Sequence, residues 1–173
     1  MVDRPCPAPR QARTKRLIGL PVRIVIASVG LARGSPYQAI YDEYVRRLSW
    51  SVELREVKLK NPLPPAAARV EEGKAILNAF PKDCQVVALD RIGEALGSEA
   101  LALRLRHWQD GGVKNVGFAI GGAEGLDAAV LQSCQLRLSL GAMTWPHLLA
   151  RVMLIEQLYR AHSIIAGHPY HRE

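Results

Sequence analysis

The sequence predicts an α/β fold in which a mainly parallel β-sheet is flanked by helices. Short apolar, β-branched segments alternate along the chain with segments of helical periodicity, as in repeated strand–helix units. The length of 173 residues suits a single domain, at about 150 residues per domain. Hydrophobic residues make up 49% of the chain and charged residues 23%, which excludes wholesale disorder and a coiled coil.

The first half of the predicted domain contains two strands and two helices. Residues 24–29 form an apolar run of mostly valine and isoleucine, as expected for a buried strand. Residues 35–48 begin with Ser-Pro and repeat apolar side chains every three or four positions, which indicates an amphipathic helix. Residues 52–59 alternate imperfectly, as a partly exposed edge strand would, and residues 66–80 form a helix after a proline-rich break.

The second half continues the alternation. The predicted strands are residues 85–89, 116–120 and 136–140, and the predicted helices are residues 98–109, 126–132 and 146–164. The last helix is apolar around most of its surface. We therefore expect it to be buried, either in the core or in an interface between subunits.

The net charge of +7 favours a polyanionic partner, but most of the excess lies in a short leader. Residues 1–20 hold five basic residues and one acidic residue, together with several prolines and no apolar secretory segment. We interpret the leader as a disordered tail, with a basic arm for nucleic acid as the alternative.

The uncharged and cysteine-containing parts of the sequence indicate a soluble, cytoplasmic protein with no membrane partner. The longest uncharged stretch, residues 138–150, is too short to cross a bilayer and contains a proline and a histidine. The three cysteines are odd in number and widely spaced, which argues against a disulfide framework and a cysteine zinc site.

Three segments follow predicted strands and so lie at the carboxyl edge of the sheet, where parallel α/β folds bind ligands. The first contains Asp90, either a ligand-binding carboxylate or an acceptor for hydrogen bonds within its own turn. The second, residues 120–125, is rich in glycine and suits either a closely bound polar ligand or a tight turn. The third, residues 139–147, is an uncharged loop that either binds a purine by its edges or simply connects strand to helix.

The glycine segment also tests a rival interpretation, a nicotinamide-dependent oxidoreductase. A dinucleotide fingerprint requires GxGxxG and an acidic residue about 20 positions further on. Here the order is GGxxG, and no acidic residue occurs between Asp127 and Glu156. The same gap disfavours a carboxylate-bound Mg²⁺ in this half of the chain.

The carboxyl terminus, residues 168–173, is dense in aromatic, imidazole and guanidinium groups. Tyrosine and histidine stack on bases and arginine binds phosphate, so RNA contact is the favoured interpretation over a frayed end. A metal site from His168 and His171 lacks a third ligand, and we expect no metal.

Four motifs together resemble the ribosomal RNA large subunit methyltransferase H family. They are LD-x-x-G at residues 89–93, IGGAEGL at 120–126, SLGAMTWPHLLARVMLIEQLYRA at 139–161 and HPYHRE at 168–173. The resemblance covers residues 22–173. It implies a homodimeric SPOUT-class enzyme with a trefoil knot in the carboxyl-terminal part of its α/β fold. The implied reaction is methyl transfer from S-adenosylmethionine to N3 of a pseudouridine in helix 69 of 23S rRNA, on the assembled ribosome.

The resemblance implies a set of cofactor contacts, and the tail and the long helix supply the residues that we expect to handle the substrate. The implied cofactor contacts are Leu89, Gly121, Leu140, Gly141, Ala142, Met143, Thr144 and Trp145. The residues expected to handle the substrate are His147, Arg151, Glu156, Tyr170, His171 and Arg172. Arg172 is the strongest candidate among them, and no individual general base is identified.

The sequence departs from the family pattern at three places. Gly141 replaces the usual serine and Glu94 a common lysine, so the alternative function is a non-catalytic ribosome- or RNA-binding protein of the same fold. Val22 aligns with the usual start of the family, and a valine codon, GTG, initiates translation in bacteria. Residues 1–21 are therefore either a misassigned start or a disordered extension, and residues 22–173 form the single working domain.

Overall fold

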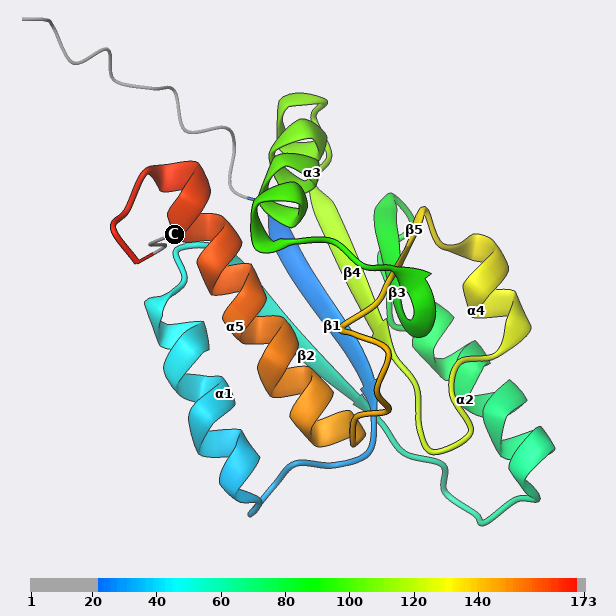
Figure 1. Ribbon diagram of the computed structural model, residues 1–173. Helices are drawn as coiled ribbons and strands as arrows, with labels where there is room; N and C mark the ends of the chain where they lie inside the picture. The colour runs from blue at the N-terminus through cyan, green and yellow to red at the C-terminus, as the bar shows by residue number, and fades with distance from the viewer. Residues whose placement is uncertain (1–21, 171–173) are drawn as a thin grey trace, which may run out of the picture.

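The computed structural model describes residues 22–170 and contains one five-stranded sheet between two layers of helices (Figure 1). The strands are β1 (Arg23–Val29), β2 (Ser51–Val57), β3 (Cys84–Glu94), β4 (Asn115–Ile120) and β5 (Leu136–Leu138). The helices are α1 (Pro36–Arg47), α2 (Pro65–Asn78), α3 (Ser98–Asp110), α4 (Ala128–Ser133) and α5 (His147–Ala166). The leader, His171 and Arg172 lie outside the described residues.

The strand order is β2-β1-β4-β3-β5, and every neighbouring pair is parallel. This confirms the predicted parallel α/β fold. Helices α1, α3 and α5 cover one face of the sheet, and α2 and α4 cover the other (Figure 1). Because all strands run the same way, their carboxyl ends share one edge, and the loops that follow them gather there. The trefoil knot implied by the resemblance stays a prediction.

The central and edge strands differ in burial as their sequences suggest. Six of the seven residues of β1 are buried, since a central parallel strand is covered by helices on both faces. Strand β2 lies at the edge of the sheet and is mostly half-buried, which confirms the expected edge position.

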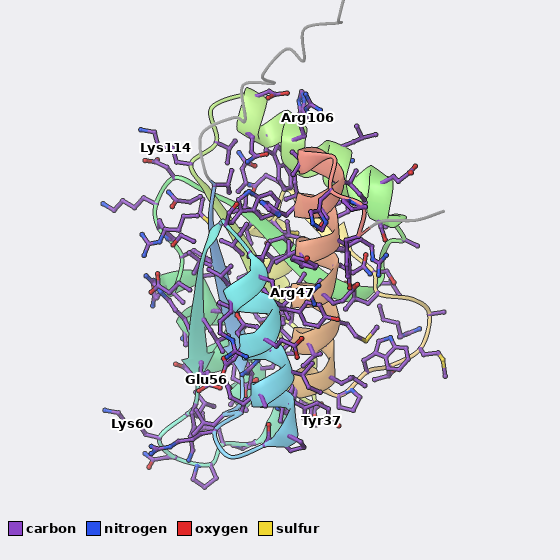
Figure 2. The ribbon with its side chains drawn as sticks, turned by 90° about the vertical axis from the view of Figure 1, so that its left-hand side faces the viewer. Tyr37, Arg47, Glu56, Lys60, Arg106 and Lys114 are labelled. Carbon is purple, nitrogen blue, oxygen red and sulfur yellow. The ribbon has the colours of Figure 1, made fainter. Side chains whose placement is uncertain are left out.

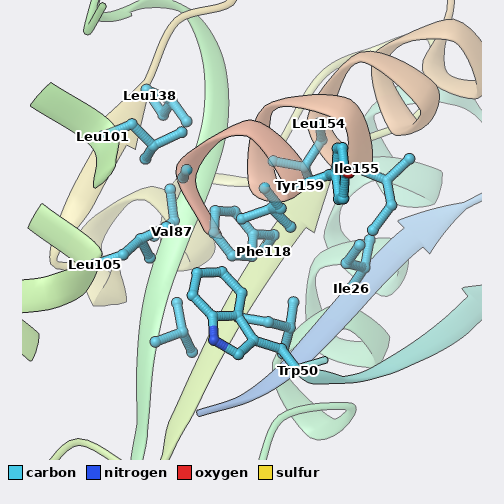
Figure 3. Packing of buried hydrophobic residues seen from close by; sticks show 14 of the residues in the cluster. Ile26, Trp50, Val87, Leu101, Leu105, Phe118, Leu138, Leu154, Ile155 and Tyr159 are labelled. Atoms are coloured by element: carbon cyan, nitrogen blue, oxygen red, sulfur yellow. The ribbon is translucent and has the colours of Figure 1, made fainter. Parts of the chain in front are cut away.

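The larger part of the core lies between the sheet and α1, α3 and α5 (Figure 3). Phe118 of β4 and Ile26 of β1 are fully buried against Leu154 and Ile155 of α5. Helix α5 thus belongs to the core, which is one of the two places, core or subunit interface, where its sequence predicted burial. No helix within residues 22–170 has the length and apolarity needed to cross a membrane.

Several element boundaries differ by a few residues from the sequence-based expectations, and those of β3, α4 and β5 lie near the candidate site. Strand β3 continues beyond residue 89 to Glu94, because after a shift in register Glu94 pairs with Leu138 of β5. Asp90 therefore lies inside β3, and its Oδ1 accepts a hydrogen bond from the backbone N–H of Ile92 at 3.2 Å. Helix α4 begins at residue 128, since Asp127 caps it by accepting from a backbone N–H. Strand β5 ends at residue 138, so Leu140 lies in the following loop.

Candidate cofactor and substrate site

A cavity of about 590 Å³ opens between the β3–α3 connection, the end of β5 and helices α1 and α5. Its walls are largely apolar. The residues that line it are Ile40, Tyr44, Ala95, Leu96, Gly97, Ser98, Leu101, Leu138, Ser139, Leu140, Gly141, Val152, Met153, Glu156 and Gln157. Among these lining residues, all of which the structure describes, Glu156 is the one with a charged side chain.

The loop after β5 is held to the β3–α3 side of the cavity by Ser139. The Ser139 hydroxyl lies 3.1 Å from the carbonyl oxygen of Arg91 and 3.0 Å from that of Gly141, and it accepts from the N–H of Gly141 at 3.1 Å. Further along, the indole N–H of Trp145 donates to the carbonyl of Leu140 at 3.2 Å. These bonds fold the loop back on itself beside the cavity.

Gly141 adopts a backbone conformation that explains part of its departure from the family pattern. Its φ is +113°, and an ideal Cβ there would meet nothing within 4 Å. Space is therefore available for the usual serine, but the positive φ disfavours any side chain. The loop in this form is suited to glycine.

The residues implied as cofactor contacts are placed unevenly around the cavity. Leu140 and Gly141 line it, and Ala142, Met143 and Thr144 continue directly as an exposed segment, with 70% of Met143 exposed. Trp145 is half-buried and packs against the core.

Two further implied contacts, Leu89 and Gly121, do not line the cavity. Leu89 packs against the core from β3. Gly121 lies in a tight turn, where a Cβ would come within 2.6 Å of the backbone of Gly125. Gly121 therefore has a steric role in the turn, and its implied contact with the cofactor stays a prediction.

Glu156 joins the cavity wall to the carboxyl-terminal turn of the chain. Its carboxylate accepts hydrogen bonds from Arg160 at 2.6 Å, from the amide of Gln157 at 2.7 Å and from the hydroxyl of Tyr170 at 3.2 Å. Both oxygens are thus engaged by donors, which fixes the carboxylate in place.

Arg151, expected to handle substrate, points away from the cavity. Its side chain is 2% exposed, and it bonds Glu56 of β2 at 2.7 Å, the hydroxyl of Ser28 at 3.0 Å and the carbonyl of Gly30 at 3.1 Å. Burial alone would raise the pKa of Glu56, but the backbone N–H of Ala32 and the Arg151 guanidinium outweigh it and hold that pKa below its usual value. In the described residues Arg151 braces α5 against the ends of β1 and β2.

His147, the first residue of α5, packs against the backbone of Gly30 at the end of β1. Burial, and next the nearby Arg151 guanidinium, lower the pKa of the His147 imidazole. The imidazole is therefore neutral at pH 7. The helix thus begins beside the loop that follows β1, next to the brace formed by Arg151.

Tyr170 is the last described residue of the tail and folds back onto α5. Its ring centroid lies 4.6 Å from that of Tyr159, in an edge-on arrangement. Burial raises the pKa of Tyr170 to about 12, so its hydroxyl is a donor at neutral pH. The structure thus brings together Leu140, Gly141, Glu156 and Tyr170 of the expected residues, and separates Arg151 from them.

The sequence interpretation missed two groups of residues around the cavity. The connection before α3, which includes Leu96 and Gly97, forms one wall, although it carries no chemical motif. Arg47 of α1 and Arg160 of α5 surround Tyr170. Arg160 lies within the motif at residues 139–161, whereas Arg47 lies outside all four motifs.

Comparisons with known proteins show which family the chain is similar to. The chain matches the predicted SPOUT methyltransferase family over residues 22–171. The ribosomal RNA large subunit methyltransferase H of Paramagnetospirillum magneticum is 48% identical over 151 residues, which span 87% of this chain and 99% of that protein. The chain belongs to the ribosomal RNA large subunit methyltransferase H family. The relative of the same name from Rhodospirillum centenum is 44% identical, with the same shares of the two chains covered.

Solved structures show the same fold at low sequence identity. A probable methylase family protein from Haemophilus influenzae has a TM-score of 0.53 and 13% identity, covering 88% of this chain and 70% of that one. A probable methyltransferase from Bordetella pertussis has a TM-score of 0.50 and 16% identity, covering 82% and 95%. At these identities the likeness concerns the fold alone.

Membership of this family makes the protein a SPOUT-class methyltransferase that uses S-adenosylmethionine. The cavity fits this cofactor. Its volume of about 590 Å³ suits a small-molecule site, and its apolar walls and uncharged loop backbone suit an adenosine group. The cavity lining contains no lysine or arginine, so it offers no cationic side chain to the phosphates of a dinucleotide.

Proposed function

We propose that this protein is a cytoplasmic methyltransferase of 23S rRNA that modifies N3 of a pseudouridine in helix 69 of the assembled ribosome. The observation that carries the proposal is the near full-length similarity to proteins named ribosomal RNA large subunit methyltransferase H, up to 48% identical over 99% of their length. The cavity beside the loop after β5 supports it, because its lining suits the methyl donor.

The main task of the protein in this reaction is to align the methyl donor with the nucleobase that receives the methyl group. S-adenosylmethionine supplies an already activated methyl group when bound. The loop at Leu140 and Gly141 would hold the cofactor. The hydrogen bond between Tyr170 and Glu156 attaches the start of the tail to the wall of the cavity. The gain from such alignment is entropic, since the reacting atoms are held in near-attack geometry.

The decisive experiment is methyl transfer from labelled S-adenosylmethionine to three substrates: intact ribosomes lacking the modification, free 23S rRNA, and ribosomes with uridine in place of the pseudouridine. We expect transfer to the first alone, and mass spectrometry of nuclease fragments should place the methyl group on the pseudouridine. Cofactor binding without transfer to any of the three would overturn the proposed substrate.

The cavity itself is tested by filling it from Gly97. This glycine lines the cavity with a φ of −68°, and a Cβ there meets nothing within 4 Å, so a side chain can be added at this wall without backbone strain or a clash at its Cβ. We expect Gly97→Trp to abolish S-adenosylmethionine binding in calorimetry. Leu103→Trp, at a position of α3 that is 67% exposed, is the matched control and should leave binding unchanged. Equal affinity in both variants would place the cofactor elsewhere.

The proposal includes a homodimer. Ile40 of α1 is 45% exposed, and it lines the cavity opening together with Val152 and Met153 of α5. An apolar edge of this kind is suited to burial against a second copy. Sedimentation analysis should give twice the chain mass, and Ile40→Asp should shift the protein toward the monomer. A wild-type protein that sediments as a monomer at micromolar concentration would contradict the dimer.

A further inference from the structure

Three tyrosines and two arginines form a compact cluster between α1, α5 and the carboxyl-terminal turn. We refer to Tyr44, Arg47, Tyr159, Arg160 and Tyr170 as the tyrosine–arginine cluster. Arg47 lies where α1 runs alongside α5 (Figure 2). The cluster connects residues that are more than a hundred positions apart in the sequence.

Arg47 is the residue that the three rings share. Its guanidinium carbon lies 4.3 Å from the ring centroid of Tyr159, 5.3 Å from that of Tyr170 and 5.6 Å from that of Tyr44. Its Nη2 also donates to the hydroxyl of Tyr159 at 3.2 Å. All three distances are within the range in which a cation is attracted to the face of an aromatic ring.

The ring contacts, rather than an ion pair, account for the position of Arg47. Its acidic neighbour Glu43 is exposed and lies 3.9 Å away, at the limit of a salt bridge. Such an exposed pair contributes little. A planar guanidinium can instead stack on one ring while donating to the hydroxyl of another group, which a lysine cannot do in the same way.

The second arginine completes the enclosure of Tyr170 from the other side. The Arg160 guanidinium carbon lies 5.1 Å from the Tyr170 ring, while Arg160 also binds the Glu156 carboxylate that accepts the Tyr170 hydroxyl. Tyr170 is therefore held at its ring by two cations and at its hydroxyl by a residue of the cavity wall. The last three residues of the sequence, which include Arg172, follow directly on it.

We propose that Arg47 is a positioning residue for methyl transfer, which holds Tyr170 against α5 so that the substrate-handling tail starts from a fixed place beside the cavity. The proposal rests on the proposed function, because it assigns the tail a part in handling the RNA. Arg47 itself touches neither cofactor nor RNA in this scheme. It acts through the tyrosines.

The first test compares Arg47→Ala with Arg46→Ala, its neighbour on α1. Arg46 is exposed and makes no hydrogen bond or ion pair with the rest of residues 22–170, so it is a matched control. We expect Arg47→Ala to lower kcat for methyl transfer to ribosomes by about tenfold, because a displaced tail misaligns the substrate. S-adenosylmethionine affinity should stay unchanged. Arg47→Lys should recover part of kcat, since it keeps the cation over the rings. A kcat equal to that of Arg46→Ala would overturn the proposal.

A double-mutant cycle with Tyr170→Ala tests whether Arg47 acts through the tail. If it does, Arg47→Ala should change kcat by less than about twofold in the Tyr170→Ala background. Losses that multiply independently would overturn the positioning role.

The same four proteins should be compared in urea unfolding, which needs no substrate. A shift of the double variant smaller than the sum of the single shifts shows that the two residues are coupled. If the wild-type protein transfers no methyl group to ribosomes, the proposed function fails while this coupling is still measured. Additive shifts in urea would overturn the contact on which the inference depends.

Discussion

Arg151 gives the sharpest test of the structure, because the sequence suggested a substrate role and the structure shows a brace. We consider Arg151→Ala. The substitution removes the bonds to Glu56, Ser28 and Gly30 and leaves a cavity where a side chain only 2% exposed had packed. Removing one partner of a fully buried pair costs about 3–5 kcal/mol.

The partial exposure of Glu56 reduces this cost. Its side chain is 26% exposed, so water solvates the carboxylate once Arg151 is gone. We therefore expect a loss in the free energy of unfolding of about 2–4 kcal/mol, between the values for exposed and buried pairs. This is a large part of the stability of a typical domain, about 5–15 kcal/mol.

Urea unfolding at pH 7, followed by tryptophan fluorescence at one fixed protein concentration, measures this loss. Arg106→Ala is the matched control, because its pair with Asp110 is exposed and 3.7 Å long, and it should cost less than about 1 kcal/mol. The pKa of Glu56 is lowered in the fold, so the pair stabilises the protein above the unfolded pKa of Glu56, and this contribution is lost as the pH falls through the folded one. The Arg151→Ala deficit should shrink in acid. A loss no larger than that of Arg106→Ala would refute the brace.

Three other predictions concern the tail, the start of α5 and the sheet edge. Arg172→Ala should cut methyl transfer far more than cofactor binding, and equal losses in both assays would contradict a substrate role for the tail. The pKa of His147 is lowered by burial and then by the neighbouring guanidinium, so the unfolded chain takes up this proton first. The free energy of unfolding should therefore fall as the pH drops below about 6.5. In urea titrations at several pH values, His147→Gln should make this dependence on pH weaker. An unchanged dependence on pH would contradict the lowered pKa of His147. Lys58 and Lys60 are exposed after β2, and Figure 2 shows Lys60 at the same end of the molecule as Glu56. We expect replacement of both lysines with alanine to weaken the salt dependence of binding to ribosomal RNA. The slope of log affinity against log salt concentration should fall by about 1 for each phosphate that a lysine had bound. An identical slope would exclude such binding.

The sequence by itself determined the type and order of the helices and strands. Each of these depends on side chains a few positions apart, such as the valines and isoleucines of β1 or the three- and four-residue repeat of α1. The motif around Leu140 and Gly141 also indicated a loop that lines the cavity in the structure. Local periodicity and short motifs were sufficient for these predictions.

Only the tertiary structure decided which face of α5 packs against the sheet. The helix is apolar nearly all round, so its sequence has no strong period to orient it, and two of its charged residues ended in opposite roles. Arg151 points to the sheet because Glu56, 95 positions away, offers it a carboxylate at the end of β2. Glu156, about 1.4 turns further on, points to the cavity and the tail.

The tyrosine–arginine cluster depends on chain packing in the same way. Arg47 and Tyr159 meet across 112 positions only because α1 and α5 lie together on one face of the sheet. That neighbourhood follows from the strand order β2-β1-β4-β3-β5, in which the pairs β1-β4 and β3-β5 are not consecutive in the chain. Side-chain periodicity reports which residues share a face of one element, whereas the pairing of distant elements is fixed by the free energy of burying their faces together.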